Sequence, residues 1–233
     1  MMSNTFDNIR GFLELGGPVV ALIAVLSVFA VALIGLKLVQ FWRERVGFHG
    51  RAERALHAWH HGSYGEARTA LESDRSAVSA ALAAAMRLAT RRLPQKTIEN
   101  EVQRIALTRL HDLQRGFRAL DAIAQIAPLL GLFGTVLGMI EAFRRLQEAG
   151  SSVDPSLLAG GIWVALLTTA AGLALAMPVS LVLTWFETRL DNERVAIETL
   201  TSSLLSQRAI GEAGDTQAVA SGGAAFEERS HAH

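Results

Sequence analysis

Three stretches of this chain are too long and too apolar for the surface of a water-soluble fold. Leu15 to Leu36 has 22 residues without a charge, and Ala122 to Ile140 has 19, of which only Gln125 and Thr135 are clearly polar. Pro155 to Phe186 has 32 residues without a charged side chain. A helix needs about 20 residues to cross roughly 30 Å of hydrocarbon. Since a backbone in lipid must satisfy its own hydrogen bonds, and no alternating strand pattern is present, we predict three transmembrane helices.

The first stretch is longer than the apolar region of a signal peptide, and the third is longer than one membrane span. A cleaved signal peptide is the alternative for the first, but its apolar region usually has about 7–15 residues after a basic start. Here the run has 22 residues and follows Asp7, Arg10 and Glu14, which favours a retained helix. The third stretch is longer than a bilayer requires, so we expect it to tilt or to emerge from the membrane.

The distribution of Lys and Arg predicts the orientation. Residues 43–118 hold 14 of the 22 basic residues, whereas the N-terminal segment has only Arg10. Arg144 and Arg145, in the loop between the second and third stretches, are a mild exception to this pattern. Because basic residues accumulate on the cytoplasmic side, we expect an outside N-terminus and a cytoplasmic C-terminus.

The region between the first two spans reads as helical. Apolar residues recur there at spacings of three to five, which is one helical stripe; they are Ile98, Val102, Ile105, Leu110, Leu113, Phe117 and Leu120. We see no strong breaker after this stripe and expect one helix from about Thr97 to about Leu146. A second stripe continues the third span through Leu190, Val195, Ile197, Leu200 and Leu204. The Gly-, Ala-, Glu- and His-rich end is expected to be disordered.

The predicted fold class is an all-α integral membrane protein whose second and third transmembrane helices extend into the cytoplasm. The expected segments are a short periplasmic N-terminus (1–14), transmembrane helix 1 (15–42), a cytoplasmic helical region (43–118), transmembrane helix 2 (119–143), a periplasmic loop (144–155), transmembrane helix 3 (156–186), a cytoplasmic helical extension (187–208) and a disordered tail (209–233).

Composition removes several classes of function. The formal net charge is zero, so nothing suggests nucleic acid binding, and the lack of cysteine excludes a disulfide framework, a zinc–thiolate site and a cysteine nucleophile. No phosphate loop or paired-acid motif stands out, so we expect neither an enzyme nor a cofactor. His57, His60 and His61 have helical spacing and are candidates for a metal, but without a carboxylate or thiol partner a solvated helix face is the favoured interpretation. His231 and His233 are interpreted as tail residues.

Small residues in the second and third spans predict close helix contacts. Gly131, Gly134 and Gly138 share one face of the second span, with Pro128 one turn earlier. The third span has a similar set of small and weakly polar residues, together with a proline: Ala165, Thr168, Thr169, Gly172, Ala176 and Pro178. Such residues let helix backbones approach closely. The threonines Thr135, Thr168 and Thr169 can bond their own backbone or line a polar path, and the residues alone leave both open.

Two segments carry a family resemblance. "IAPLLGLFGTVLGMIEAF" (126–143) and "LAGGIWVALLTTAAGLALAMPVSLVLTWFE" (158–187) resemble the signature helices of the ExbB/TolQ/MotA proton-channel family. The three-span topology is similar to ExbB and TolQ, which lack the extra span of MotA. The resemblance covers about residues 11–205, and it is strong in spans two and three and weak in the cytoplasmic loop.

The resemblance implies an assembly and a mechanism. It implies a homo-oligomer, a pentamer, in the bacterial inner membrane, surrounding a dimer of a single-span partner of the ExbD/TolR type, with a TonB/TolA-like protein as a further partner. Protons, taken up by an aspartate of the partner, would drive the complex. Thr135 and Thr169 match the family threonines of the ion path, with Thr168 adjacent, and Pro128 and Pro178 match family prolines.

One position departs from the family pattern. ExbB and TolQ usually carry glutamate in a stretch of the form G-I-x-E-A-L, and here Val164 occupies its place. Valine cannot carry a proton, so three interpretations compete. The partner aspartate alone suffices, which we favour; or Glu141 compensates; or the chain has a structural role.

The sequence thus predicts a motor subunit that energises outer-membrane transport (ExbB-like) or envelope maintenance (TolQ-like), and it does not separate the two. A non-conducting scaffold that holds the partner is the alternative, supported by Val164. A flagellar stator subunit is disfavoured because a fourth span is missing.

Overall fold

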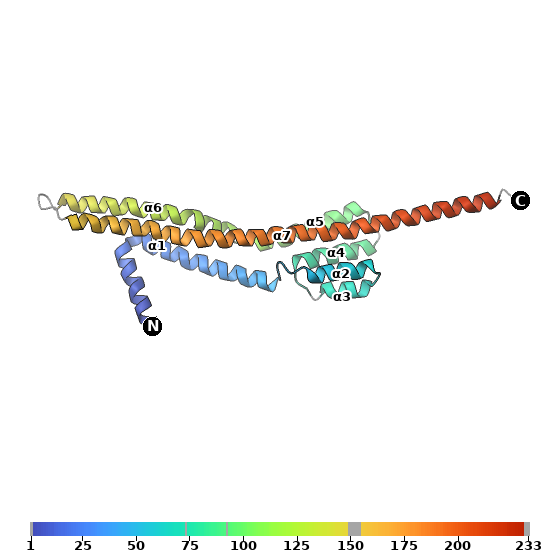
Figure 1. Cartoon of the computed structure of the whole chain (residues 1–233), viewed down its shortest axis with the longest axis horizontal. Helices are drawn as coiled ribbons and strands as arrows, with labels where there is room; N and C mark the ends of the chain where they lie inside the picture. The colour runs from blue at the N-terminus through green and yellow to red at the C-terminus, as the bar shows by residue number, and fades with distance from the viewer. Residues whose placement is uncertain (1, 73, 92, 149–154, 231–233) are drawn as a thin grey trace. The chain divides into compact units, whose positions relative to one another are not determined.

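The computed structural model describes residues 2–72, 74–91, 93–148 and 155–230. Within these ranges every regular element is an α-helix, which confirms the all-α prediction. The helices are α1 (Met2–Arg43), α2 (Gly50–His60), α3 (Tyr64–Glu72), α4 (Ala77–Thr90), α5 (Gln95–Gln114), α6 (Phe117–Glu148) and α7 (Pro155–Ser230), labelled in Figure 1.

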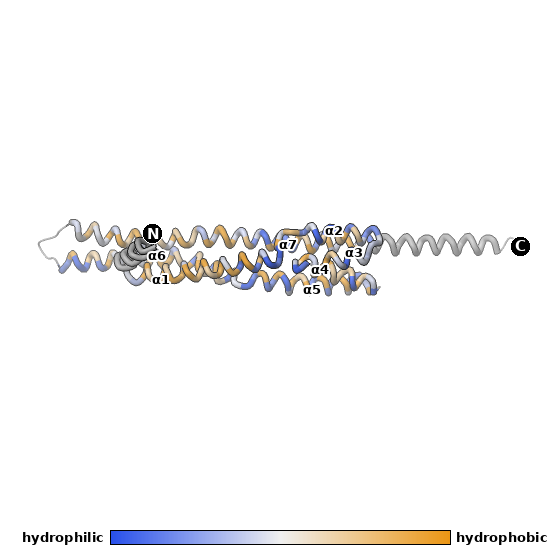
Figure 2. Tube along the Cα trace, turned by 90° about the horizontal axis from the view of Figure 1, so that it is seen from below, coloured by the Kyte–Doolittle hydropathy of each residue, from blue (hydrophilic) through white to orange (hydrophobic). Residues whose placement is uncertain are grey.

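The chain divides into two compact units. The membrane unit comprises Met1–Gln40 and Arg115–Thr188, and the second unit comprises Phe41–Gln114 and Arg189–His233. Three helical stretches among the described residues are long and apolar enough to cross a membrane, as predicted: Gly17–Arg43, Gln95–Glu148 and Leu158–Gln207. Figure 2 shows hydrophobic residues concentrated along α1, α6 and the first half of α7, whereas α2 to α5 alternate between polar and apolar.

Helix α1 begins well before the predicted first span. It bends at Gly17, close to the point where that span starts. Gly17 has φ 65° and ψ −166°, outside the helical region, and Pro18 follows it. Proline lacks a backbone N–H and clashes with the preceding turn, so a bend is expected here. The membrane-spanning stretch starts at this bend and runs to Arg43, close to the predicted segment 15–42.

The expected single helix from Thr97 to Leu146 is wrong. Helix α5 ends at Gln114 and α6 starts at Phe117. Between them Gly116 has φ 87°, a left-handed conformation that glycine adopts at helix ends without steric cost. The N–H of Leu120 already donates to the Gly116 carbonyl at 3.2 Å, so the same glycine ends one helix and starts the next.

The expected end of the third helical segment also differs. The disordered tail was predicted over 209–233, yet α7 continues to Ser230, and residues 231–233 lie outside the described ranges. Ala and Glu are frequent in this segment and have high helix propensity, which offsets its glycines. Half of the predicted periplasmic loop 144–155 also lies outside the described residues, and α6 extends to Glu148.

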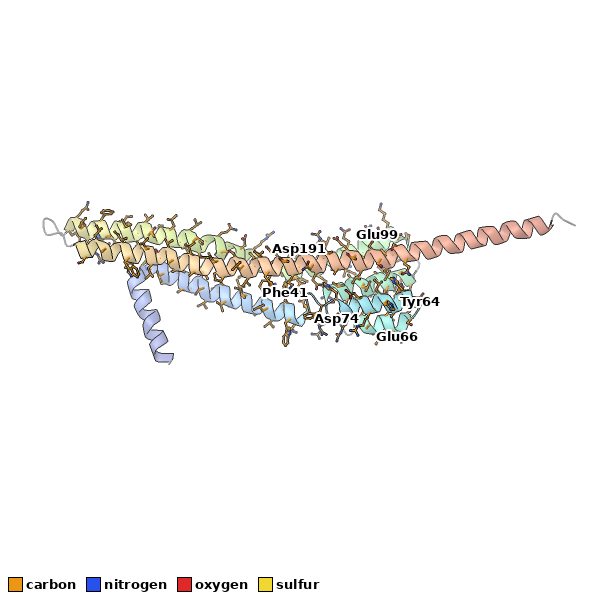
Figure 3. The ribbon with its side chains drawn as sticks, in the orientation of Figure 1. Phe41, Tyr64, Glu66, Asp74, Glu99 and Asp191 are labelled. Carbon is orange, nitrogen blue, oxygen red and sulfur yellow. The ribbon has the colours of Figure 1, made fainter. Side chains whose placement is uncertain are left out.

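The second unit is held together by the predicted stripes. Ile98 and Leu113 of α5 are fully buried, and the Leu204 residue of α7 is only 1% exposed. The stripe assignment fails at Val195, whose side chain is 60% exposed. In Figure 3, Tyr64 and Glu66 extend from α3, and Glu99 extends from α5.

Candidate functional site: the seam between α6 and α7

Helices α6 and α7 of the membrane unit run side by side in opposite directions and meet at small residues (Figure 1). A Cβ added at Gly131 would lie 2.9 Å from the Thr169 Cα, and one added at Gly138 would lie 2.9 Å from the Ala165 Cβ. Real Cβ atoms do not come this close to backbone, so only glycine permits the observed approach. Below, "the seam" means this α6–α7 contact.

The seam continues in both directions with the same chemistry. At one end Gly172 packs directly against the Ala127 carbonyl, and at the other a Cβ on Gly161 would lie 2.5 Å from the Ala142 Cβ. Small residues that allow backbone contact are the usual solution where two helices pack in lipid, because burying apolar surface gains nothing there. From the sequence we expected the glycine and threonine faces of these helices to meet further copies of the chain. The packing glycines Gly131, Gly134, Gly138 and Gly172 instead all lie in a contact within one chain.

Two of the three candidate threonines lie in this seam. The Thr168 hydroxyl shares its hydrogen between two carbonyl acceptors, Ala165 of its own helix at 2.7 Å and Gly131 of α6 at 3.1 Å. The Thr169 hydroxyl donates to the same Gly131 carbonyl at 3.2 Å. Thr168 is only 2% exposed and Thr169 is half-buried. Both hydroxyls thus bridge the two helices at one carbonyl.

The third candidate, Thr135, lies elsewhere on α6. Its hydroxyl donates to the Leu132 carbonyl of its own helix at 2.6 Å. With Phe143, Arg144 and Gln147 it lines an open groove of about 630 Å³ on α6. Thr135 therefore faces a surface on which another chain or water can lie, whereas Thr168 faces the interior of the seam.

Val164 occupies the position of the family glutamate, and Glu141 is the residue expected to compensate in one of the three interpretations. Val164 is half-buried on α7. Glu141 is on α6, next to Ala142, which contacts Gly161 across the seam. Its carboxylate forms exposed ion pairs with Arg144 and Arg145 of the same helix, each at 3.0 Å.

The prolines do not break their helices. Pro128 lies inside α6 and Pro178 inside α7, half-buried and exposed respectively. Proline is tolerated within transmembrane helices, where neighbouring groups satisfy the freed backbone.

Sequence reasoning missed an aromatic cluster in the membrane unit. Lys37 of α1 is buried, donates to Gln40 Oε1 at 2.7 Å, and places Nζ 5.6 Å from the ring centroid of Phe117 on α6. The Phe117 ring stacks on Phe186 of α7, with centroids 5.8 Å apart, and Phe186 is fully buried. All three spans thus meet at one cation–aromatic stack. An isolated Lys after an apolar run was the available signal.

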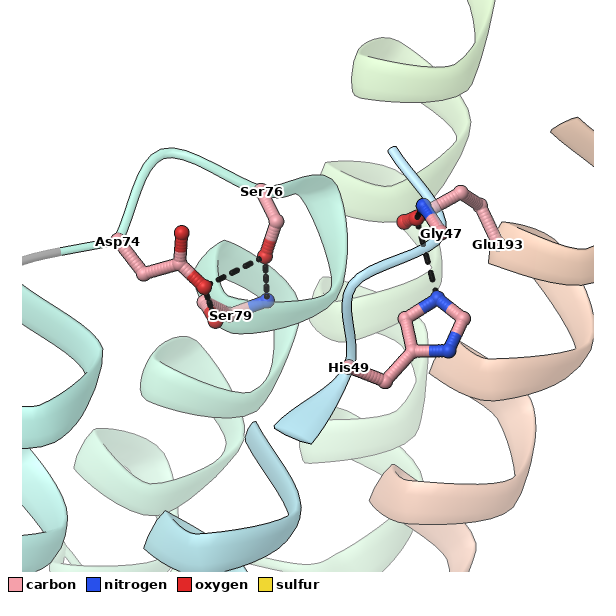
Figure 4. Close-up of polar contacts among 6 residues, drawn as sticks. All are labelled: Gly47, His49, Asp74, Ser76, Ser79 and Glu193. Atoms are coloured by element: carbon pink, nitrogen blue, oxygen red, sulfur yellow. Dashed lines mark hydrogen bonds and ion pairs between the residues drawn. The ribbon is translucent and has the colours of Figure 1, made fainter. Parts of the chain in front are cut away.

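A buried carboxylate in the second unit was also missed. Glu193 of α7 is fully buried, and its Oε1 accepts a hydrogen bond from the Gly47 N–H at 2.5 Å and lies 3.0 Å from His49 Nε2 (Figure 4). Figure 4 also shows Ser76, which caps α4 by accepting from the Ser79 N–H at 3.1 Å. A buried charge is expensive unless it is paired, so Glu193 ties the 47–49 loop to α7.

The predicted histidine cluster lies at the C-terminal end of α2, with His57 and His60 in the helix and His61 directly after it. His57 and His61 are exposed, and His60 is half-buried. Burial, and then the neighbouring His57 and His61, lower the pKa of His60 below its ordinary value. Within the described part of the chain no group of three or more His, Cys, Asp or Glu side chains is placed to hold a metal.

Much of the apolar surface of the spans remains uncovered. Only 22% of the apolar window in the first and second spanning stretches is buried within the chain, and 28% in the third. In Figure 3 side chains project outward along α6 and α7. Large exposed residues there include Leu129, Phe133, Ile140, Trp163, Leu166 and Leu181. Exposed apolar area on this scale is typical of surfaces that face lipid or other subunits.

Comparison with known proteins adds to this geometry. The family model described as "MotA/TolQ/ExbB proton channel family" matches residues 73–199, more than half of the chain. A putative biopolymer transport protein ExbB homolog of Methanothermobacter thermautotrophicus is 28% identical over 197 residues, which cover 84% of this chain and 68% of that protein.

Bacterial relatives match over a shorter stretch. Biopolymer transport protein exbB1 of Vibrio cholerae is 50% identical over 68 residues, which cover 29% of this chain and 30% of that protein. Biopolymer transport protein ExbB of Neisseria meningitidis is 42% identical over 66 residues, covering 28% of this chain and 30% of that protein. This chain therefore matches less than a third of the length of these two bacterial relatives.

Proposed function

The chain belongs to the MotA/TolQ/ExbB proton channel family, and from this premise we propose that it is the ring-forming subunit of a motor complex driven by the proton-motive force. In this proposal the subunit lies in the bacterial inner membrane as a pentamer, has a periplasmic N-terminus and cytoplasmic C-terminus, and is not an enzyme. It surrounds a single-span dimer of the ExbD/TolR type and passes energy to a TonB/TolA-like protein, using protons as the driving ion and no cofactor.

The observation that carries the proposal is that the inner and outer faces of the α6–α7 pair differ in their side chains and contacts. The glycine faces of α6 and α7 pack against each other in the seam, inside one chain. The opposite faces expose large apolar side chains and the groove beside Thr135. A helix pair that is rigid within the subunit and apolar outside is suited to pack against further copies, against lipid, or against a partner helix.

The proposed ion path uses the threonines in two ways. Thr135 lines the groove on α6 and would meet water or the partner helix there. Thr168 and Thr169 bridge α6 and α7 at the Gly131 carbonyl, so their hydroxyls would position the helices that border the path. A unit charge that crosses a membrane potential gains roughly 2.3 kcal/mol per 100 mV. A few protons per step would match the cost of repacking a protein interface.

Val164 supports the second candidate, a scaffold that holds the partner without conducting. From Pro155 to Phe186 the chain has no carboxylate, and Glu141 is held by two arginines. In the conducting proposal, the acid that takes up the proton therefore comes from the partner.

Proton flux discriminates between the two. The chain and its single-span partner are reconstituted together in liposomes carrying a pH-sensitive dye and a potassium diffusion potential. The motor proposal expects a flux above that of liposomes that hold the chain alone. Flux equal to empty vesicles, with a complex that is intact by native mass spectrometry, would favour the scaffold. Native mass spectrometry of the same sample also tests the pentamer.

A further inference from the structure

His57 lies in the last turn of α2 and His61 directly follows the helix, with its N–H donating to the His57 carbonyl at 3.2 Å, and the two side chains converge. The two Nε2 atoms are 3.2 Å apart, and the ring centroids are 4.4 Å apart with the planes at 50°. Both residues are exposed, so the space in front of the two nitrogens is open to solvent. Residues four apart on a helix share one face, which explains why the rings meet.

The separation matches that of two ligands on one metal ion. Zinc binds imidazole nitrogen at about 2.0–2.1 Å with tetrahedral geometry, which places two ligand nitrogens roughly 3.3 Å apart. The observed 3.2 Å differs from this separation by about a tenth of an ångström. The two Nε2 atoms lie within hydrogen-bonding distance of each other, and the tautomer decides which ring donates. A metal bound at both Nε2 atoms requires the hydrogen between them to move to Nδ1 of its own ring, which is a change of tautomer.

We infer that His57 and His61 form a binding site for a late first-row divalent cation, such as Zn²⁺, Ni²⁺ or Cu²⁺. Imidazole suits these ions, whereas Mg²⁺ and Ca²⁺ prefer oxygen ligands. Two protein ligands leave the remaining coordination positions to water or to other exchangeable donors, so the ion exchanges readily and the site is not a structural one. This inference does not depend on the proposed channel, because the pair lies in the second unit.

The test is a metal titration of the full chain in lipid nanodiscs, purified with a tag that contains no histidine. The background carries His231→Asn and His233→Asn, so that tail histidines do not contribute. ZnCl₂ and NiCl₂ are titrated by calorimetry at pH 7.5. We expect one saturable ion per chain, and at least a tenfold loss of affinity in His57→Asn and in His61→Asn, because each leaves a single ligand. MgCl₂ is expected not to compete.

The matched control is His111→Asn, an exposed histidine on α5. Its affinity is expected to equal that of the parent, and helicity by circular dichroism is expected to be unchanged in all variants. Equal zinc affinity in the His57 and His61 variants would overturn the inference, as would competition by Mg²⁺. Should a variant misfold, electron paramagnetic resonance of Cu²⁺ bound to the parent decides: coupling to two nitrogens supports the pair, and coupling to one or none overturns it.

Discussion

Thr168 donates its hydroxyl hydrogen to the backbone carbonyl of Gly131 across the α6–α7 seam, at 3.1 Å. Gly131 has no side chain in the way, and Thr168 is buried by the approach that Gly131 permits. The small residue and the polar residue thus depend on each other: without the glycine the helices would stand apart, and without the hydroxyl the carbonyl would have one donor fewer.

The first prediction concerns this hydrogen bond. Thr168→Val keeps the shape of the side chain and removes the donor, so the seam should lose about 0.6–1.7 kcal/mol, the range found for side-chain hydrogen bonds in membrane helices. The loss is moderate because Thr169 still donates to the same carbonyl. Unfolding in mixed micelles, followed by circular dichroism, measures the change.

The control for this variant is Thr184→Val. Thr184 is exposed on α7 and donates only to Ser180 of its own helix, at 3.0 Å. It should leave the unfolding free energy nearly unchanged. Equal effects of the two valines would show that the bond between the helices contributes nothing.

The second prediction concerns the glycine that faces Thr168. A Cβ on Gly134 would lie 2.7 Å from the Thr168 Cβ, so even Gly134→Ala should destabilise the seam by about 1–3 kcal/mol, and Gly134→Leu should prevent its formation. Gly160→Ala is the matched control, because nothing lies within 4 Å of its added Cβ. In a helix it should be neutral or slightly stabilising. Unfolding in mixed micelles measures all three variants, and an unfolding free energy of Gly134→Leu equal to that of the parent would refute the packing argument.

The spans and the seam residues could be predicted because they depend on local composition. A run of about 20 uncharged residues leaves few alternatives to a spanning helix, and glycines at spacings of three and four must share a face. What covers that face is a long-range property. Periodicity carries no information on which helices meet, and Gly131 and Thr168 are 37 residues apart, so the expected contact with copies of the chain gives way to a contact with α7 of the same chain.

The break at Gly116 was not predictable from propensity alone. A glycine inside a helix costs only about 1 kcal/mol relative to alanine, which a long apolar stripe readily offsets. The break depends on the left-handed φ of 87°, and this conformation is chosen by the packing on either side.

The burial of Glu193 instead of Val195 has a similar origin. The stripe pattern places an apolar residue inside, and Val195 fits it. The carboxylate is buried because the Gly47 N–H and His49 are available to it, and His49 lies 144 residues away in the chain. Sequence pattern therefore predicts the helix and its approximate face, but not a buried polar contact of this range.

The third prediction tests that contact. Glu193→Ala should destabilise the second unit by about 1–3 kcal/mol, because it leaves the half-buried Gly47 N–H without its acceptor. Glu193→Gln keeps an oxygen at the same place and should cost less. Glu198→Ala on the same helix serves as the control, since its ion pair with Arg194 at 3.5 Å is exposed and worth little. Chemical denaturation of the three variants gives the comparison.

The fourth prediction concerns pH. Burial and the neighbouring histidines lower the pKa of His60 below 6.5, so between that lowered pKa and 6.5 the unfolded chain binds more protons than the folded one. Stability is therefore complete above about pH 6.5 and falls as the pH drops towards the lowered pKa. Thermal unfolding in EDTA from pH 7.5 to 5.0 should show a decline that His60→Asn reduces and His111→Asn does not. An equal decline in all three proteins would exclude His60 as the cause.

The last prediction concerns conduction. The Thr135 hydroxyl bonds only within α6 and faces the groove on that helix, so Thr135→Val removes no contact between helices and should leave assembly and unfolding unchanged. If the groove borders the proton path, the loss of the hydroxyl should lower the proton flux several-fold, and Thr135→Ser should restore it. Thr168→Val, in contrast, should lower stability as well as flux, because its hydroxyl holds the seam. The pair of measurements thus separates a group on the path from a group that positions the helices beside it. Unchanged flux in Thr135→Val, with an intact complex, would remove Thr135 from the path.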